Sequence, residues 1–245
     1  MKTVAIIQAR EGATRLPGKV MMDLAGKPAL QRVIDRVSKA KLVDTIVVAT
    51  EPKSEKIISY CSKNRINYFI GSEDDVMLRV LKAAEKYKAE TIVEITADCP
   101  VVDFHLIDDC IRLYNNNTQL DYVSNCVPVR SFPDGCDVQV YSYSILKIVR
   151  NILKYAKKEI KHVGWNIPNT YGDIGYACIP APTHLNFPDL RITLDTIEDF
   201  KVIESIYKYF WHDNFNTFDI IDYLDRNPEI KALNSNIKPK AIEEG

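Results

Sequence analysis

A short cationic loop near the start of the chain carries side chains suited to binding phosphate. Residues 9–19 combine three basic side chains, two glycines and a hydroxyl group: Arg10, Gly12, Thr14, Arg15, Gly18 and Lys19. Arginine can grip phosphate with two N–H groups, lysine adds a mobile charge, and glycine lets backbone N–H groups approach phosphate oxygens. The spacing fits neither the P-loop nor the dinucleotide-binding glycine pattern. A basic loop can simply be solvated, but this one follows an apolar run at 3–9, which favours a phosphate site.

Two aspartates that follow apolar runs are candidate ligands for a divalent cation. Asp98 follows the run at 91–96, and Asp195 likewise follows a short apolar run. The carboxyl ends of parallel strands meet at one edge of a sheet, where the cationic loop also emerges. Mg²⁺ commonly takes one or two protein carboxylates and completes its shell with water and substrate phosphates. The alternative is a helix cap, a role that Thr196 and Asp199 could also fill after Asp195.

The segments around these residues alternate between apolar runs and helical periodicity. Buried strands are predicted at 3–9, 45–50, 66–70 and 91–96. Helices are predicted at 30–37, 54–64, 74–87 and 104–114. This alternation predicts an α/β fold with a right-handed, mostly parallel open sheet.

The second half of the chain departs from that rhythm. Prolines, a glycine and an alternating segment predict a small antiparallel excursion within 122–140. Helices are predicted at 142–155, 157–163, 197–210 and 218–224, and short strands at 175–179 and 191–194. No internal repeat or linker is visible in the 245 residues. The simplest organisation is one domain at 1–233, an inserted lobe for substrate binding or dimerisation at about 122–165, and a C-terminal tail at 234–245.

Composition narrows the class of protein. The 32 basic and 33 acidic side chains nearly cancel, which argues against a nucleic-acid-binding or membrane-binding surface. The apolar stretch at 4–7 is too short for a signal peptide, and no stretch approaches the roughly 20 apolar residues of a membrane span, so we expect a cytoplasmic protein. The six cysteines form no C-x-x-C pair, which favours buried thiols over a zinc or redox site; Cys99 is notable for following Asp98.

Several motifs resemble one family of enzymes. The run A-R-x-x-x-T-R-L-P-G-K occupies 9–19 and is followed by Leu24, Gly26, Lys27 and Pro28. Further blocks stand at Gly71–Val76, Thr96–Pro100, Phe132–Gly135 and Leu194–Asp199. In this order they resemble the cytidylyltransferases that make CMP-Kdo and CMP-sialic acid, and most of all the subgroup of spore-coat polysaccharide synthesis. The resemblance implies a GT-A-like (Rossmann-like) nucleotide-binding fold, a Mg²⁺ ion held by Asp98 and Asp195, and a homodimer.

The resemblance also implies roles for individual residues. Arg10, Lys19 and Asp98 would be catalytic. The nucleotide would contact Ala9, Arg10, Glu11, Gly12, Thr14, Arg15, Lys19, Ser72, Asp74, Val76, Thr96 and Ala97. The implied reaction is an in-line attack by an acceptor hydroxyl or phosphate on the α-phosphorus of CTP or another nucleoside triphosphate, with release of pyrophosphate. Catalysis would rest on positioning and charge neutralisation, and no general base is evident.

Base and acceptor recognition are less defined by the sequence. CMP-Kdo synthetases carry a glutamine shortly before the metal aspartate, where this chain has Ile95-Thr96-Ala97. Arg79 could contact the nucleotide or pair with Asp75, one helical turn away. The candidate acceptor-binding residues are Asn125, Asp134, Asp137, His162 and Arg191. An arginine suits a substrate carboxylate and an acidic pair suits hydroxyl or ammonium groups, whereas the histidine could equally be structural. The acceptor would be a sugar acid or a related small molecule, with or without a phosphate group.

Two other functions remain open at this point. A GT-A glycosyltransferase would share the fold, but such enzymes usually hold their metal with Asp-x-Asp, and no two aspartates of this chain have that spacing. A non-catalytic nucleotide-binding relative would be expected to lack one of the two metal aspartates, and both Asp98 and Asp195 are present.

Overall fold

The computed structural model describes residues 2–158, 160–170 and 174–238. Its centre is a seven-stranded sheet in the order β3-β2-β1-β4-β6-β5-β7. The strands are β1 (Thr3–Gln8), β2 (Thr45–Thr50), β3 (Tyr68–Ile70), β4 (Thr91–Thr96), β5 (Tyr122–Ser124), β6 (Gln139–Ser142) and β7 (Tyr176–Cys178). β1, β2, β3 and β4 pair in parallel, β6 runs antiparallel to both β4 and β5, and β7 is parallel to β5. The predicted α/β fold with a mostly parallel sheet is confirmed.

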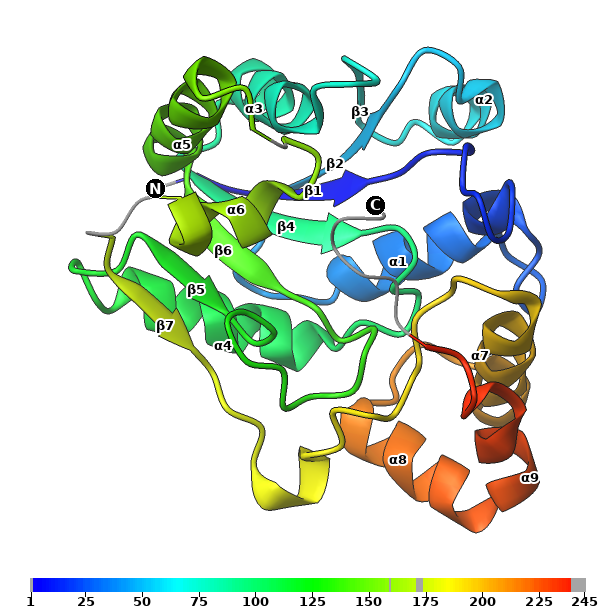
Figure 1. The fold of residues 1–245 in the computed structure, drawn as a ribbon. Coiled ribbons are helices and arrows are strands. Elements are labelled where there is room, and N and C mark those ends of the chain that lie inside the picture. Colours follow the sequence, from blue (N-terminus) through cyan, green and yellow to red (C-terminus); the bar gives the residue numbers. More distant parts are fainter. Residues whose placement is uncertain (1, 159, 171–173, 239–245) are drawn as a thin grey trace.

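Helices cover both faces of the sheet (Figure 1), and the central strands β1 and β4 are therefore buried on both sides. The helices are α1 (Ala29–Val37), α2 (Glu55–Lys63), α3 (Val76–Tyr87), α4 (Phe104–Asn115), α5 (Tyr143–Tyr155), α6 (Val163–Thr170), α7 (Ile197–Phe210), α8 (Thr217–Arg226) and α9 (Pro228–Lys231). One apolar cluster packs α3, α5 and α6 on one face, and the other packs α1, α2, α4, α7 and α8 on the opposite face. This three-layer arrangement is what near-continuous apolar strands require.

The order of the strands places a crevice beside β1 and β4. From β1 the chain moves outward to β2 and β3, and then crosses back over α3 to β4 on the other side of β1. Gln8 and Thr96 are register partners at the carboxyl ends of these strands, and the Ala97 N–H donates to the Gln8 carbonyl at 2.9 Å. Such a switch point is where open α/β sheets bind ligands. It is also where the cationic loop leaves β1.

Residues 125–138 form the predicted excursion between the antiparallel strands β5 and β6. The fully buried Asn125 holds it together: its Nδ2 donates to the Cys136 carbonyl at 2.9 Å, and its Oδ1 accepts from the Val138 N–H at 2.8 Å. The turn at Gly135 lies against residues 190–193, because the Asp134 N–H donates to the Leu190 carbonyl at 2.9 Å. The excursion therefore reaches the segment that leads to Asp195.

Gly135→Ala is expected to destabilise the protein by at least about 2 kcal/mol, because φ at this position is +115° and a Cβ would lie 2.6 Å from the backbone of Ile192. Gly26→Ala is the matched control, since Gly26 also has a positive φ (+90°) but has nothing within 4 Å of a Cβ. Thermal unfolding should show the larger loss for Gly135→Ala. Equal losses would mean that the close approach of the two backbones carries no energy.

Two predicted elements were wrong. The described residues of the predicted helix at 157–163, which exclude 159, are not helical before Val163, because α5 ends at Tyr155 and α6 begins at Val163. Lys157 adopts φ +53°, and the Ile160 carbonyl accepts from the Met77 N–H at 3.2 Å at the start of α3. No strand forms over 191–194. Only an isolated bridge joins Arg191 to Asp134, because the Leu194 N–H donates to the Asp98 carbonyl of an irregular loop.

The predicted tail begins inside the packed structure. Asn234 is buried, and its Nδ2 donates to the Arg191 carbonyl at 3.0 Å. Most of the remainder of the predicted tail, 239–245, lies outside the described residues. Within the described chain, no helix is both long enough and apolar enough to cross a membrane.

Candidate active site

The loop after β1 is fastened to the fold by Glu11. Its Oε1 accepts hydrogen bonds from the Lys56 and Ile57 N–H groups at 2.7 and 3.3 Å, at the start of α2. The Glu11 N–H donates to Ser54 Oγ at 3.1 Å, and the Glu11 carbonyl accepts from the Gly18 N–H at 2.9 Å. Glu11 thus shapes the loop, whose cationic side chains are left for the crevice.

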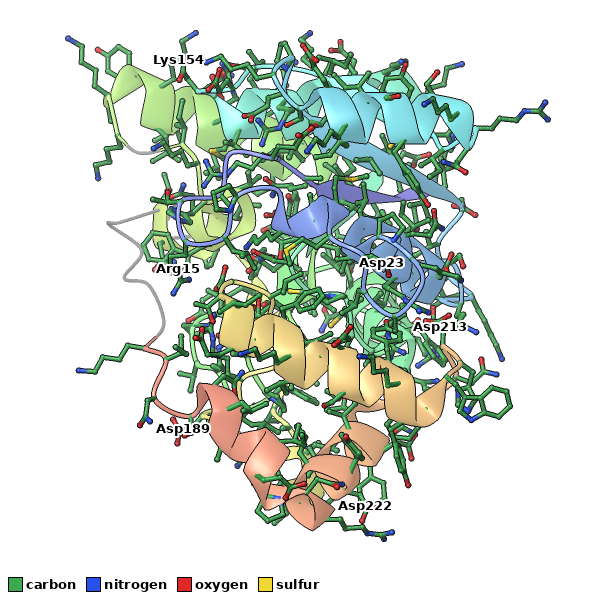
Figure 2. All side chains as sticks on the ribbon, turned by 90° about the vertical axis from the view of Figure 1, so that its right-hand side faces the viewer. Arg15, Asp23, Lys154, Asp189, Asp213 and Asp222 are labelled. Atoms are coloured by element: carbon green, nitrogen blue, oxygen red, sulfur yellow. The ribbon has the colours of Figure 1, made fainter. Side chains whose placement is uncertain are left out.

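A cavity of about 280 Å³ lies over the carboxyl ends of β1 and β4. Its wall contains these residues from the predicted site: Ala9, Arg10, Thr14, Arg15, Lys19, Val76, Thr96, Ala97, Asp98, His162 and Asp195. Figure 2 looks onto this edge of the sheet and shows Arg15 between the α3–α5 layer and α7. The remaining predicted residues do not line it: Glu11, Gly12, Ser72, Asp74, Asn125, Asp134, Asp137 and Arg191.

Asp98 and Asp195 meet at the ammonium group of Lys19. Lys19 Nζ lies 2.8 Å from Asp98 Oδ2 and 2.7 Å from Asp195 Oδ1, and Arg15 Nη2 lies 2.8 Å from Asp195 Oδ2. Burial alone would lower the pKa of Lys19, but the two carboxylates outweigh it and raise that pKa. Burial likewise opposes ionisation of Asp195, whose pKa is nonetheless lowered by Lys19, Arg191 and Arg15. Lys19 and Asp195 are therefore both charged at neutral pH.

Neither aspartate serves as a helix cap. The cap of α7 is a capping box formed by Thr196 and Asp199, and the cap of α4 is Asp103. Neither carboxylate is therefore committed to a helix terminus, and both face the cation-lined cavity instead.

Arg191 holds Asp195 in place through a network of hydrogen bonds. Its Nη2 donates to Asp195 Oδ2 at 2.6 Å, its Nε to Asp199 Oδ1 at 2.9 Å, and its Nη1 to Asp134 Oδ2 at 3.0 Å. All of these partners belong to the chain itself, so the guanidinium is committed before any substrate carboxylate arrives. The geometry makes Arg191 a positioning residue for Asp195.

The acidic pair of the excursion is also paired internally. Arg130 Nη2 donates to Asp137 Oδ2 at 2.7 Å and lies 3.5 Å from Asp134 Oδ1. Burial and the neighbouring Asp137 raise the pKa of Asp134 to about 6, against the opposing effect of Arg130 and Arg191. Asp134 and Asp137 are therefore held by Arg130 and Arg191 within the chain.

A buried glutamate, Glu94, lies on β4 next to Gln8, a residue of the cavity wall. Glu94 is only 4% exposed, and it accepts hydrogen bonds from Gln8 Nε2 at 2.6 Å, from the Tyr141 hydroxyl and from the Gly164 N–H. Burial raises its pKa to about 7, although the three hydrogen bonds favour the ionised form. Tyr122 stacks on Tyr141 with ring centroids 6.2 Å apart and closes the network on its other side.

Glu94 predicts a pH dependence of stability. Its folded pKa of about 7 lies above the unfolded value of 4.5, so its contribution is fully present below pH 4.5 and is lost as the pH rises through 7. Between pH 4.5 and 8 the free energy of unfolding of the wild type should fall by about 3 kcal/mol relative to Glu94→Gln, which does not titrate. Asp134 titrates in both proteins, so its contribution to the pH dependence cancels in the difference between them. Urea unfolding across this range measures the difference, and parallel curves would contradict the assignment.

Comparison with known proteins identifies the family of this chain. The sequence model of the family described as "Cytidylyltransferase" matches residues 4–169. This chain belongs to the cytidylyltransferase family. An uncharacterised protein of Methanocaldococcus jannaschii is 36% identical over 100% of this chain and 99% of its own length. The spore coat polysaccharide biosynthesis protein SpsF of Bacillus subtilis is 31% identical over 91% of this chain and 94% of its own.

A solved cytidylyltransferase structure shares the whole fold. It comes from Leptospira borgpetersenii, is 29% identical, and superimposes with a TM-score of 0.87 over 98% of this chain and 100% of its own. The sequence blocks at 9–19, 71–76 and 96–100 fall inside the part of the chain that matches the family, and Asp195 lies outside it. The position of Asp195 in the site therefore rests on its contacts with Lys19 and Arg15.

Other residues of the site in this cytidylyltransferase escaped the sequence analysis. Gln8, Ala13, Val20, Glu73 and Lys161 line the cavity, Arg130 pairs with Asp137, and Arg150 pairs with Asp75. Arg79 also lines the cavity. Its Nη1 donates to the Ser72 carbonyl at 2.7 Å, while Asp75 pairs with Arg150 instead. A signal existed for Gln8, the polar residue that ends a buried strand.

Proposed function

We propose that this cytidylyltransferase transfers CMP from CTP to a sugar acid or a related small acceptor, with release of pyrophosphate and dependence on Mg²⁺. One observation carries the proposal: Asp98 and Asp195, from distant parts of the chain, flank the same ammonium group beside a cationic loop. Carboxylates converging next to clustered arginine and lysine are suited to a metal–triphosphate complex. Of the sequence-based roles, Arg10, Lys19 and Asp98 remain our candidates for catalysis.

The residues present fit Mg²⁺. Asp98 and Asp195 already hold a cation between them, and the described residues contain no group of three or more His, Cys, Asp or Glu side chains that could enclose a metal alone. Mg²⁺ prefers this arrangement, since it binds through one or two carboxylates plus substrate phosphates. Asp98 and Asp195 would hold the ion, which would offset charge on the α-phosphate.

The chain itself would supply orientation and charge. Arg10, Arg15 and Lys19 would bind the triphosphate and keep the α-phosphorus in line with the acceptor oxygen. The new P–O bond forms to that oxygen, the bond to the bridging α–β oxygen breaks, and pyrophosphate leaves with the electron pair. His162 lines the cavity and is our candidate to orient the acceptor hydroxyl. The acceptor proton would pass to water or to a substrate carboxylate.

The cellular role follows from the relatives and is part of the proposal. The name of the B. subtilis relative refers to spore coat polysaccharide biosynthesis, which supports a surface-polysaccharide acceptor here. We also propose a cytoplasmic homodimer. A glycosyltransferase that uses a nucleotide sugar is the competing function, and family membership counts against it.

The test is pyrophosphate release from a panel of substrates. The four nucleoside triphosphates are each combined with Kdo-like acids, nonulosonic acids and sugar phosphates, with Mg²⁺ or with EDTA. The expected result is pyrophosphate from CTP with one acceptor class, and none with EDTA. Sugar transfer from a nucleotide sugar without pyrophosphate would contradict the proposal.

A further inference from the structure

The side-chain amide of Gln8 stands at the cavity with a fixed orientation. Gln8 ends β1, is half-buried and lines the cavity. Its Nε2 donates to Glu94 Oε1 at 2.6 Å. The amide therefore turns its nitrogen toward the interior of the sheet, which leaves the Oε1 atom for the cavity side. Within the described residues, no group donates a hydrogen bond to this oxygen.

Glu94 enforces that orientation. Three donors converge on its carboxylate: Gln8 Nε2, the Tyr141 hydroxyl and the Gly164 N–H. If the amide of Gln8 were reversed at pH 8, where Glu94 is mostly ionised, its oxygen would face a carboxylate oxygen and neither could donate. Because Glu94 is buried among strands β1, β4 and β6 and helix α6, bulk water cannot replace these donors. The amide is thus held by a group that never enters the cavity.

The same carboxylate holds a second wall of the cavity. Gly164 is the second residue of α6 and lies two residues after His162. Its N–H donates a hydrogen bond to Glu94. On the other side, the Ile160 carbonyl accepts from the Met77 N–H at 3.2 Å. Residues 161 and 162 are therefore fastened at both ends where they line the cavity, and one of the two fastenings is Glu94.

Four other acceptor side chains at the cavity are already engaged. Asp98 and Asp195 are bound to Lys19, and Glu73 is paired with Lys53 at 2.8 Å. The Thr96 hydroxyl lies 3.2 Å from Cys99 Sγ. Gln8 differs from these in offering an uncharged, oriented and unengaged oxygen. Such a group rejects a ligand that lacks the matching donor, because its own hydrogen bond is then lost.

We propose that Gln8 is a specificity-determining residue whose Oε1 accepts a hydrogen bond from an amino or hydroxyl group of a bound substrate, and that Glu94 is its positioning residue. The inference rests on the proposed function, which supplies two sources of such a donor: the exocyclic amino group of cytosine, which uracil lacks, and a hydroxyl group of the acceptor.

The test compares wild type with Gln8→Leu, which keeps the approximate size and removes the amide, and with Gln119→Leu, the same change on an exposed loop. Binding of CTP and UTP is titrated at pH 8, and KM for the acceptor is taken from pyrophosphate release. We expect Gln8→Leu to lose about tenfold in one parameter. A lower affinity for CTP but not for UTP assigns the donor to the base. A higher KM for the acceptor with unchanged CTP binding assigns it to the acceptor.

Glu94→Gln separates orientation from mere packing. Its amide can donate to Gln8, so the Gln8 amide can reverse and present N–H to the cavity. Glu94→Gln should therefore weaken the same step as Gln8→Leu, as a lower CTP affinity or a higher acceptor KM. We expect kcat to change less than KM, and thermal unfolding to show a folded protein. If Gln8→Leu matches Gln119→Leu in CTP binding, UTP binding and acceptor KM, the inference is overturned. A wild-type chain that neither binds CTP nor releases pyrophosphate instead removes the proposed function itself.

Discussion

Asp98→Asn is expected to slow pyrophosphate release by about a thousandfold while the protein remains folded. The amide keeps the shape of the side chain but removes one of the two charges that face Lys19. A neutral oxygen is a poor ligand for a hard divalent cation, so the metal–triphosphate complex would be held by Asp195 alone. The effect should fall mainly on kcat, since charge on the α-phosphate develops during the reaction.

Stability should change little in this variant. The Asp98 side chain is 28% exposed, and Lys19 keeps its contact with Asp195. The matched control is Asp109→Asn, the same change on the exposed surface of α4, where Asp109 pairs with Arg112. Turnover measured at saturating substrate, together with circular dichroism, compares the two. Equal turnover in Asp98→Asn and in the wild type would exclude Asp98 from the active site.

Lys19→Met should weaken CTP binding by about ten- to a hundredfold and, at the same time, strengthen binding of a divalent cation without nucleotide. Lys19 is a buried ammonium, which explains the first effect through the loss of a charged donor to phosphate. The second effect follows because the same ammonium now occupies the space between Asp98 and Asp195. Without it the two carboxylates repel each other and favour a metal ion.

Titration of CTP at low and high salt, and of Mn²⁺ without nucleotide, measures both effects. The loss of CTP affinity should shrink as the salt concentration rises, because salt screens the missing charge. Lys201→Met, on the exposed face of α7, is the control for the same substitution. A Lys19→Met protein that melts earlier but binds CTP and Mn²⁺ like the wild type would assign Lys19 a structural role only.

The parallel half of the fold could be predicted because its signals are local. The run at 3–9 and the run at 91–96 are apolar on both faces, and a helical period follows each, so neighbouring residues decide the structure. Residues 157–163 misled the same reasoning. Ile160 is hydrogen-bonded to Met77, and Gly164, just after this range, to Glu94; both partners lie far away in the sequence, where a local pattern cannot reveal them. The short run at 191–194 had no regular strand to pair with.

The site was predictable where chemistry and position coincide. The loop at 9–19 and the two aspartates follow strand ends, and the structure brings them together at Lys19. Arg191 was predicted to face a substrate, but its partners Asp134 and Asp195 could be found only once the excursion was folded against it. Glu94 gave a signal that went unused: a glutamate within an otherwise apolar buried strand needs donors, and those donors lead to Gln8.

The central claim is that Asp98 and Asp195 together bind a metal–CTP complex, and titration calorimetry of CTP tests it most directly. Wild type and the Asp98→Asn/Asp195→Asn double variant are each titrated with Mg²⁺ present and with EDTA. The account predicts that wild type binds CTP at least about tenfold more tightly with Mg²⁺, and that the double variant loses this difference. Equal affinity of the wild type with Mg²⁺ and with EDTA, or an undiminished effect of Mg²⁺ in the double variant, would contradict it.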